Sequence, residues 1–359
     1  MSKRILAVIS DIHSSPQYVS IFKEIIKSGA DIHIFVSPVS NSTFVQNLLE
    51  NSIPFQEINL STNSNCIKQL MRIFFYIRKN RIEIVYSSGQ WATIVTTIAA
   101  RLANRKKIIF TRHYSDFHHK RGMKHWIYID RLIAKLATRI IAVSKNVAVL
   151  MTDLEKIDCK KIEVIYNSID FDTFYTVRNQ EKSNETLIIG VVSRLVSLKG
   201  INFTIKAFKE FLLIKPNAKL ILIGGNSSES HNIFEELASI PSSNVELIEH
   251  TANMKNWYSK FDVFVHVPVS RNAEAFGLVY LEALAAGVPC IFTKSGILNE
   301  VDIFNDYFIA VDFENYEQIY KSLVSLLVYN FKLELVPENL FEEFSESKMT
   351  SRYLDLLIT

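Results

Sequence analysis

The fold can be predicted from three consecutive segments: KRILAVIS at residues 3–10, QYVSIFKEIIKSG at 17–29 and ADIHIFVS at 30–37. The first and third are short runs rich in β-branched residues, which is typical of buried strands. The apolar residues of the middle segment recur at helical spacing, and Gly29 is a helix stop signal. Two strands joined by a helix predict a right-handed βαβ unit and therefore a parallel sheet.

The same alternation continues along the chain. Further strand-like runs are IEIVYSS at 82–88, KKIIFTRH at 106–113, RIIAVS at 139–144, KIEVIYN at 161–167, LIIGVVSR at 187–194, AKLILIGG at 218–225, NVELIEH at 244–250, DVFVHVP at 262–268 and VPCIFT at 288–293. Segments of helical length lie between them. We therefore predict the α/β class with two Rossmann-like, doubly wound domains that face a cleft, and this cleft is the expected ligand site.

A polar stretch without periodicity, FDTFYTVRNQEKSNET, marks the expected connection between the domains. The expected division is an N-terminal domain at 1–170, the connection at 171–186, a C-terminal domain at 187–340 and a closing helix at 341–359 that could cross back to the first domain. Up to Asp170 there are 24 Lys and Arg against 13 Asp and Glu, a net charge of +11, and the remainder carries −8. A basic and an acidic half favour domains with different partners, and ordinary drift of surface charge is the alternative.

Composition excludes several classes of protein. With 48% hydrophobic and 21% charged residues, the chain is neither disordered nor fibrous. Cys66, Cys159 and Cys290 are far apart and form no CxxC pair, which argues against a disulfide scaffold or a zinc module and favours a reducing compartment. The first residues read as a strand rather than a signal peptide, and no apolar stretch reaches the roughly 20 residues that span a bilayer. We expect a cytoplasmic protein, and a peripheral position on a membrane stays open.

The most informative segment for chemistry is AEAFGLVYLEALAAGVPCIF at 273–292. A helix is expected to begin at Gly277, where the missing side chain lets an anion approach free N–H groups and the positive helix end. Glu274 precedes this start and Glu282 lies eight positions later, a spacing of roughly 12 Å along a helix. Carboxylates accept hydrogen bonds from vicinal hydroxyls, so this pair suits a sugar and a ribose on either side of a diphosphate. An ordinary helix with solvated glutamates is the alternative.

A second segment, GVVSRLVSLKG at 190–200, adds two cations. Arg194 would lie at the carboxyl end of a buried strand, and Lys199 follows on a short loop. The planar fork of Arg and the mobile ammonium of Lys together suit a diphosphate, although such a pair alone is more often a surface feature. The dinucleotide fingerprint GxGxxG is missing after the first strand and a Walker A loop is absent, which disfavours dehydrogenases and P-loop nucleotidases.

Residues 190–200 and 274–289 together resemble the paired signatures of retaining glycosyltransferases of family 4, which have the GT-B architecture. FTRHYSD at 110–116, IIAVSKNVAVLM at 140–151 and VIYNSIDFDTF at 164–174 match as well. The resemblance runs through most of the chain and is weakest before about Val85. It implies a nucleotide-sugar donor, such as a UDP- or GDP-sugar, and neither a metal nor another cofactor.

The resemblance also implies roles for single residues. The donor would contact Arg194, Lys199, Glu274, Phe276, Gly277, Leu278 and Glu282. Of these, Arg194 and Lys199 would hold the diphosphate, with support from the backbone at Gly277 and Leu278. Glu282 would hold the ribose hydroxyls and Glu274 those of the transferred sugar. His113 would reach the donor sugar or the reaction centre from the N-terminal domain, which makes His113, Arg194, Lys199 and Glu274 the expected catalytic set.

Two departures from the family pattern leave specificity open. Relatives often carry paired glycines after the first strand, where this chain has Asp11 to Pro16, so acceptor contacts cannot be carried over. His250 stands where relatives often have a glycine near the base pocket, so the base of the donor stays open.

Two patterns suggest metal sites but fit them poorly. His113, His118, His119 and His125 form a local cluster whose spacing matches no standard metal site. Asp170-Phe171-Asp172 has the DxD form that metal-dependent sugar transferases use, but it lies at the domain junction and is interpreted as linker.

A basic segment lies beside the expected acceptor side. Against one acid, Asp116, it carries Arg101, Arg105, Lys106, Lys107, Arg112, Lys120, Arg121 and Lys124. Nucleic-acid binding would need interleaved aromatic platforms, which this segment lacks. Attraction to anionic lipid headgroups is the preferred interpretation and a solvated face the alternative. We expect peripheral contact with the inner face of the cytoplasmic membrane and no nucleic-acid partner.

The expected function is retaining transfer of a sugar from a nucleotide-sugar to a glycan or lipid-linked acceptor in bacterial surface polysaccharide biosynthesis, of the lipopolysaccharide or capsule type. No carboxylate stands out as a nucleophile, so same-face substitution is favoured, with the leaving diphosphate helping to deprotonate the acceptor. A noncatalytic protein of the same fold that binds sugar nucleotides or polysaccharide is the alternative, and a GT-B epimerase or phosphorylase is another.

Overall fold

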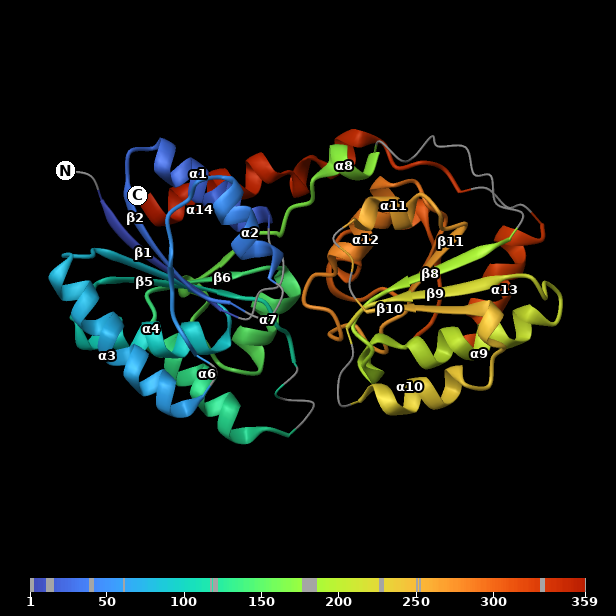
Figure 1. Ribbon diagram of the computed structural model, residues 1–359, viewed down its shortest axis with the longest axis horizontal. Helices are drawn as coiled ribbons and strands as arrows, with labels where there is room; N and C mark the ends of the chain where they lie inside the picture. The colour runs from blue at the N-terminus through green and yellow to red at the C-terminus, as the bar shows by residue number, and fades with distance from the viewer. Residues whose placement is uncertain are drawn as a thin grey trace. The chain divides into compact units, whose positions relative to one another are not determined.

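A computed structural model divides the chain into two compact units, residues 1–168 with 346–359 and residues 169–345. The structure describes residues 3–10, 16–38, 42–60, 62–116, 118, 122–175, 186–225, 229–249, 251, 253–329 and 333–358. Some expected features lie outside the described residues: the loop at 11–15, His119, Lys120, Arg121, most of the connection at 171–186, and His250. Each unit contains one parallel sheet with helices on both faces (Figure 1), which confirms the predicted α/β class with two Rossmann-like domains.

The sheet of the first unit has the strand order β3-β2-β1-β4-β5-β6-β7. Its elements are β1 (Arg4–Ser10), α1 (Pro16–Lys27), β2 (Asp31–Ser37), α2 (Thr43–Glu50), β3 (Gln56–Glu57), α3 (Asn63–Lys79), β4 (Ile84–Ser88), α4 (Gln90–Leu102), β5 (Lys107–Arg112), α6 (Lys124–Leu136), β6 (Arg139–Ala142), α7 (Lys145–Asp153), β7 (Ile162–Val164) and α14 (Glu346–Ile358). The strand order reverses at β1, which lies between β2 and β4. Folds of this kind bind ligands at the carboxyl ends of the strands beside such a reversal.

Alternate residues of β1 face the two helix layers, because successive side chains of a strand point to opposite faces. Ile5 and Ile9 pack with α1, α2 and α14, whereas Leu6 and Val8 pack with α3 and α4. Figure 1 shows α1 and α14 on one face of this sheet and α3 and α4 on the other. Tyr353 of α14 is buried in the first of these layers, so the last helix of the chain completes the core of the first unit.

The sheet of the second unit has the strand order β10-β9-β8-β11-β12-β13. Its elements are α8 (Phe171–Tyr175), β8 (Ile188–Val192), α9 (Ile201–Leu212), β9 (Lys219–Ile223), α10 (Ser230–Leu237), β10 (Val245–Ile248), α11 (Met254–Tyr258), β11 (Val263–His266), α12 (Leu278–Ala285), β12 (Cys290–Phe292), β13 (Ile309–Ala310) and α13 (Tyr316–Leu327). Ile189, Phe208 and Val265 are central to the core between this sheet and its α9 and α13 layer. The strand order reverses at β8, so the loops after β8 and β11 meet at the carboxyl edge.

The chain enters the second unit at Ile169 and leaves it at Ser345, a few residues from the expected boundaries at 170 and 340. The Ile169 N–H donates to the Phe344 carbonyl over 3.1 Å, and Ile169 forms a parallel β-bridge with Ser345. The two crossings are therefore paired with each other. Across the part of the chain that the structure describes, no helix has the length and apolar character needed to cross a membrane.

Candidate active site

Glu274 is the centre of a buried polar cluster in the second unit. Its carboxylate forms an ion pair with Lys199, and its Oε1 lies 2.8 Å from Nε2 of His266. Lys199 ends the short 3₁₀ turn after β8, His266 is the last residue of β11, and Glu274 precedes α12. The Glu274 N–H also donates to Oγ of Ser295 over 3.1 Å. Loops from neighbouring strands thus converge on one carboxylate.

The protonation states in this cluster follow from burial and charge. Burial alone would raise the pKa of Glu274, but Lys199 and the hydrogen bond from His266 outweigh it and lower this pKa to about 2. Burial lowers the pKa of His266, although the bond to Glu274 opposes the shift. A neutral His266 must carry its proton on Nε2, because carboxylate oxygens only accept. Glu274 is therefore a fixed anion, and no described protein group bonds to its Oε2.

Helix α12 begins directly after this cluster, with Gly277 as its N-cap at a φ of 89°. Glycine is needed there, because a Cβ would lie 2.5 Å from the ring of Tyr280 and because this φ is costly for other residues. The N–H groups at a helix start are suited to an anion. Phe276 is buried and its ring centroid lies 6.1 Å from that of Phe344, so its side chain belongs to the core rather than to a donor contact surface.

Arg194 and Lys199 share the loop after β8. Arg194 is exposed, whereas Lys199 is turned onto Glu274. This loop is packed backbone to backbone: a Cβ on Gly200 would lie 1.9 Å from the Val267 carbonyl oxygen, and one on Gly224 would lie 1.8 Å from that of Ser193. The two glycines let the ends of β9 and β11 approach the loop, which holds both cations at the edge of the sheet.

Glu282 lies further along α12 and has a different environment. The Tyr258 hydroxyl donates to its Oε2 over 2.9 Å. Burial raises the pKa of Glu282 to about 7, and the bond from Tyr258 opposes this shift. The segment from Glu274 through α12 therefore presents one permanent anion, Glu274, and one carboxyl group, Glu282, that titrates near neutral pH. Divergent carboxyl environments of this kind are typical of functional sites.

His113 belongs to the first unit, where it directly follows β5 and joins a chain of hydroxyl groups. Its Nε2 lies 2.8 Å from the Tyr18 hydroxyl and 3.1 Å from Oγ of Ser88. From Tyr18 the chain of contacts continues to Tyr86 at 3.2 Å, from there to Thr111 at 2.7 Å, and on to Tyr353 of α14 at 3.1 Å. Desolvation by the surrounding protein lowers the pKa of His113, so its imidazole is neutral at pH 7.

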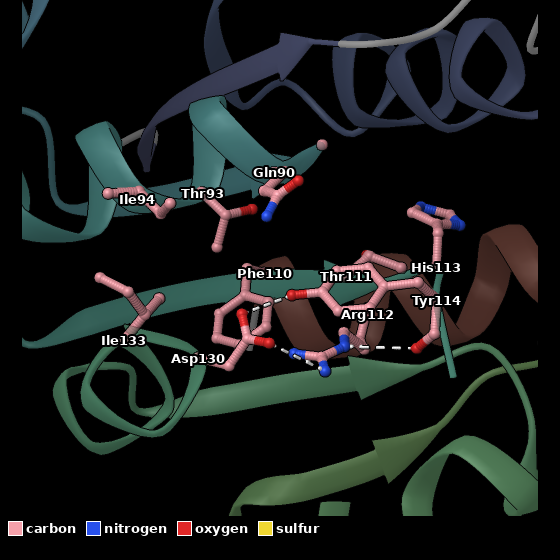
Figure 2. Close-up of a pocket in the computed structure, with 11 residues that line it drawn as sticks. Gln90, Thr93, Ile94, Phe110, Thr111, Arg112, His113, Tyr114, Asp130 and Ile133 are labelled. Carbon is pink, nitrogen blue, oxygen red and sulfur yellow. Dashed lines mark hydrogen bonds and ion pairs between the residues drawn. The ribbon is translucent and has the colours of Figure 1, made fainter. Parts of the chain in front are cut away.

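A second polar cluster in this unit surrounds Arg112. Its Nη2 lies 2.6 Å from Oε1 of Glu155 and 3.3 Å from Oδ2 of Asp130. Figure 2 shows Asp130 between Arg112 and Tyr114, whose hydroxyl donates to Asp130 over 2.5 Å. The expectation that Arg112 belongs to a basic surface was therefore wrong, because two carboxylates neutralise its guanidinium in the interior.

The cavity in Figure 2 lies beside this cluster, between α4, β5 and α6, and has a volume of about 40 Å³. A water molecule needs about 10 to 15 Å³ on the same measure, so the cavity can hold a few waters and no sugar ring. Its polar lining comes from Gln90, Thr93, Thr111, Arg112, His113, Tyr114 and Asp130. The cavity therefore adjoins His113 but is too small to hold the donor sugar.

The histidine and DxD patterns take up other roles. His118 contacts Asp130 at 2.8 Å and stacks on Trp126, away from the hydroxyl chain of His113. Asp170 caps α8, since its Oδ1 accepts from the Thr173 N–H over 3.1 Å. Among the residues that the structure describes, no three His, Cys, Asp or Glu side chains are grouped so that they could hold a metal ion.

The charged residues of this candidate site were predicted from the sequence, whereas the groups that contact them were not. His266, Tyr258, Tyr18 and Ser88 were not predicted as site residues. His266 had a detectable signal, because it is the polar residue of the otherwise apolar run VFVHVP at 263–268. The others are ordinary in their sequence context, and their partners become visible only in the folded chain.

Two Rossmann-like units, each with one parallel sheet, are the architecture of GT-B proteins, and comparisons with known proteins identify the family. Residues 19–173 match "Glycosyltransferase Family 4", and residues 175–333 match "Glycosyl transferases group 1". The chain is 32% identical over 286 residues to the capsular polysaccharide biosynthesis glycosyltransferase CapM of Staphylococcus aureus, covering 75% of this chain and 73% of that protein. It therefore belongs to glycosyltransferase family 4, which confirms the resemblance found in its sequence.

Two further relatives agree with this assignment. The UDP-Gal:alpha-D-GlcNAc-diphosphoundecaprenol alpha-1,3-galactosyltransferase of Escherichia coli is 24% identical over 265 residues, which is 66% of each chain. The crystal structure of Anabaena Alr3699/HepE in complex with UDP aligns with a TM-score of 0.76 over 99% of both chains, at 15% sequence identity. The second likeness shows the shared GT-B fold.

Proposed function

We propose that this glycosyltransferase moves a sugar from a nucleotide-sugar donor, a UDP- or GDP-sugar, to a glycan or lipid-linked acceptor of a bacterial surface polysaccharide, with retention at the anomeric carbon. One observation carries the donor assignment: Lys199 and His266 hold Glu274 as an anion directly before the start of α12. A helix start and a lysine suit the diphosphate, and a fixed carboxylate suits the hydroxyls of a sugar.

In the proposed reaction the bond between the anomeric carbon and the leaving diphosphate oxygen breaks, and the bond to the acceptor oxygen forms on the same face. The acceptor proton passes to the leaving diphosphate. Arg194, Lys199 and the N–H groups of α12 would stabilise the negative charge that grows on the phosphate. These groups supply the positive charge themselves, so we propose that transfer needs no metal ion. His113 would contact the donor sugar as a neutral imidazole.

The relatives support the substrate classes. CapM is named for capsular polysaccharide biosynthesis, and the E. coli relative is named for a UDP-sugar donor and a diphosphoundecaprenol acceptor. The Anabaena structure contains UDP. A lipid-linked acceptor would place the enzyme in the cytoplasm, with peripheral contact at the inner face of the cytoplasmic membrane.

Donor binding and turnover test the proposal. Thermal shifts with a panel of UDP-, GDP-, ADP- and dTDP-sugars should single out one base, because a bound ligand stabilises the native state. The anomeric configuration of the transferred sugar, measured by NMR, should match that of the donor. Glu274→Gln should abolish most turnover, and Glu246→Gln, an exposed acid on β10 of the same unit, should not. Inverted product, or donor binding without any turnover across an acceptor panel, would contradict the assignment.

A further inference from the structure

Helices α3, α4 and α6 form a layer on one face of the first unit's sheet, with α4 in contact with the other two (Figure 1). Their sequences contain a single acid, Asp130, which is buried beside Arg112. Their cations are all exposed: Lys68, Arg72, Arg78, Lys79, Arg101, Lys124, Arg131 and Lys135. We refer to the outer side of these three helices as the basic helical face. None of its own exposed side chains is a carboxylate.

Large apolar side chains lie exposed on the same face. Ile67, Met71 and Phe75 of α3 have exposed fractions of 69%, 46% and 60%. Residues four positions apart are neighbours on a helix surface, so these three form a continuous stripe. Lys68 and Lys79 lie roughly 100° and 120° around the helix from Ile67, which places them along one side of the stripe.

Helix α6 repeats this arrangement. Tyr128 and Leu132 are one turn apart and 68% and 53% exposed. Lys124 and Lys135 fall on the same side of the helix by spacing, whereas Ile133 and Ala134 face the interior. Cations and exposed apolar groups therefore occur together on two helices of one layer.

The basic segment expected from the sequence shares only Arg101 and Lys124 with this face. Arg101, Arg105 and Lys106 precede β5, and Lys124 follows it. A strand of six residues separates these groups by about 17 Å, so they lie toward opposite ends of the sheet. The cations that share a surface come instead from three helices that are separate in the sequence.

We propose that the basic helical face docks on an anionic lipid bilayer, with the exposed apolar side chains of α3 and α6 entering the headgroup region. The proposal rests on the proposed function in one respect: a lipid-linked acceptor would be displayed at the bilayer surface. Cations are attracted to anionic headgroups, and apolar side chains among them gain by leaving water. A nucleic acid fits less well: Phe75 and Tyr128 could stack on bases, but the exposed Ile67, Met71 and Leu132 beside them have no aromatic ring to do so.

Co-sedimentation of the full chain with vesicles tests this surface. The vesicles are phosphatidylcholine alone or an equal mixture with phosphatidylglycerol, at low and at high salt. We expect binding to the anionic vesicles only, weakening with salt. Lys68→Glu/Lys79→Glu and Ile67→Gln/Phe75→Gln should each weaken binding at least tenfold. The matched controls Lys23→Glu/Lys27→Glu and Ile26→Gln/Leu49→Gln change exposed residues of α1 and α2, on the other face of the same sheet, and should bind like the wild type.

Three results would overturn the proposal: no binding by the wild type, equal loss in the control variants, or retention in both face variants. The face would instead belong to a nucleic acid or to a second copy of the chain under two conditions. The wild type would have to bind a single-stranded oligonucleotide or dimerise in solution without binding vesicles, and Lys68→Glu/Lys79→Glu would have to lose that interaction. Donor hydrolysis measured without vesicles separates this proposal from the proposed function. The variants of the basic helical face should keep donor hydrolysis at the wild-type rate. A wild type that binds vesicles but does not hydrolyse the donor would contradict the proposed function alone.

Discussion

His266 donates its Nε2 hydrogen to Oε1 of Glu274 over 2.8 Å, and the ring of Tyr280 lies edge-on to the imidazole. A phenylalanine at position 266 would fill the same space without the donor. A hydrogen bond to a charged group contributes about 1.5–3 kcal/mol, so His266→Phe should lower kcat/KM for the donor roughly 10- to 100-fold. Steady-state kinetics check this, with His231→Phe, an exposed histidine of α10, as the control. Wild-type kinetics for His266→Phe would show that the bond does not position Glu274.

The lowered pKa of Glu274 predicts a pH-dependent contribution to stability. Its pKa of about 2 in the folded chain lies below the ordinary value of 4.5. A carboxyl group shifted in this direction stabilises the fold above its unfolded-state pKa, and the contribution is lost as the pH falls from about 4.5 to 2. Glu274→Gln should therefore cost about 3 kcal/mol at pH 7 and clearly less at pH 3.5. Urea unfolding at both pH values measures the difference, and a cost independent of pH would contradict the assigned state.

The raised pKa of Glu282 predicts a pH dependence of stability opposite in sign to that of Glu274. Burial raises its pKa from 4.5 to about 7, so the folded chain binds this proton more tightly than the unfolded chain does. The stabilisation is fully present below about pH 4.5 and is lost as the pH rises to 7. Glu282→Gln should accordingly be more stable than the wild type at pH 8, by about 3 kcal/mol, and should lose this advantage at pH 4.5. Thermal unfolding at the two pH values tests the sign.

The substitution Glu282→Gln should also weaken binding of the donor. An amide replaces one acceptor oxygen with an NH₂ group, so Glu282→Gln offers fewer acceptors to ribose hydroxyls. We expect a higher KM with little change in kcat, because the ribose lies far from the reacting bond. A variant that is less stable at pH 8, or one with unchanged KM, would contradict the respective half of this prediction.

Arg112 predicts a purely structural effect. It neutralises Glu155 and Asp130 in the interior of the first unit, and its guanidinium lies 3.5 Å from the centre of the Tyr114 ring. Arg112→Leu would leave two buried carboxylates without their cation, which typically costs about 3–5 kcal/mol. Chemical denaturation should show this loss, while Arg101→Leu, at the exposed end of α4, should stay within about 0.5 kcal/mol of the wild type. Equal stability of the two variants would place Arg112 at the surface after all.

Physical reasons explain which parts of the structure could be predicted from the sequence and which could not. Strands β1, β2 and β8 and helix α1 were predictable because periodicity reports which face of an element is buried. Glu274, Gly277 and Glu282 were predictable as a group because the start of α12 keeps them within one local segment. His266 and Tyr258 come from other elements, so no local pattern links either of them to its acid.

Arg112 illustrates the converse error. In the sequence it stands in a run of cations, and local composition predicts an exposed basic segment. In the fold, alternate residues of β5 point to opposite faces, and Arg112 meets carboxylates from α6 and from Glu155 after α7. Burial of a charge depends on partners that are distant in sequence, so local composition could not show that Arg112 lies in the interior.

The hydroxyl chain from Tyr353 to His113 leads to the last prediction. The Tyr18 hydroxyl contacts Nε2 of His113 directly, whereas the Tyr353 hydroxyl contacts Thr111 and also interacts with Tyr18. Because the imidazole is neutral, its partners decide which nitrogen carries the proton. Tyr18 is thus a positioning residue for His113, and Tyr353 chiefly joins α14 to the core. Tyr18→Phe should change the tautomer populations of His113, whereas Tyr353→Phe should leave them near those of the wild type.

Nitrogen NMR of the His113 ring, with His113→Gln to assign its signals, measures this directly. We expect Tyr18→Phe to shift the ring nitrogen signals and lower kcat about tenfold, with KM less affected. Tyr353→Phe should keep kcat within about twofold and cost about 1 kcal/mol of stability, because it removes one buried hydrogen bond. Tyr329→Phe, an exposed tyrosine after α13, is the control for both. Unchanged His113 signals in Tyr18→Phe, or an equal loss of kcat in both core variants, would show that Tyr18 supports the fold and does not orient the imidazole.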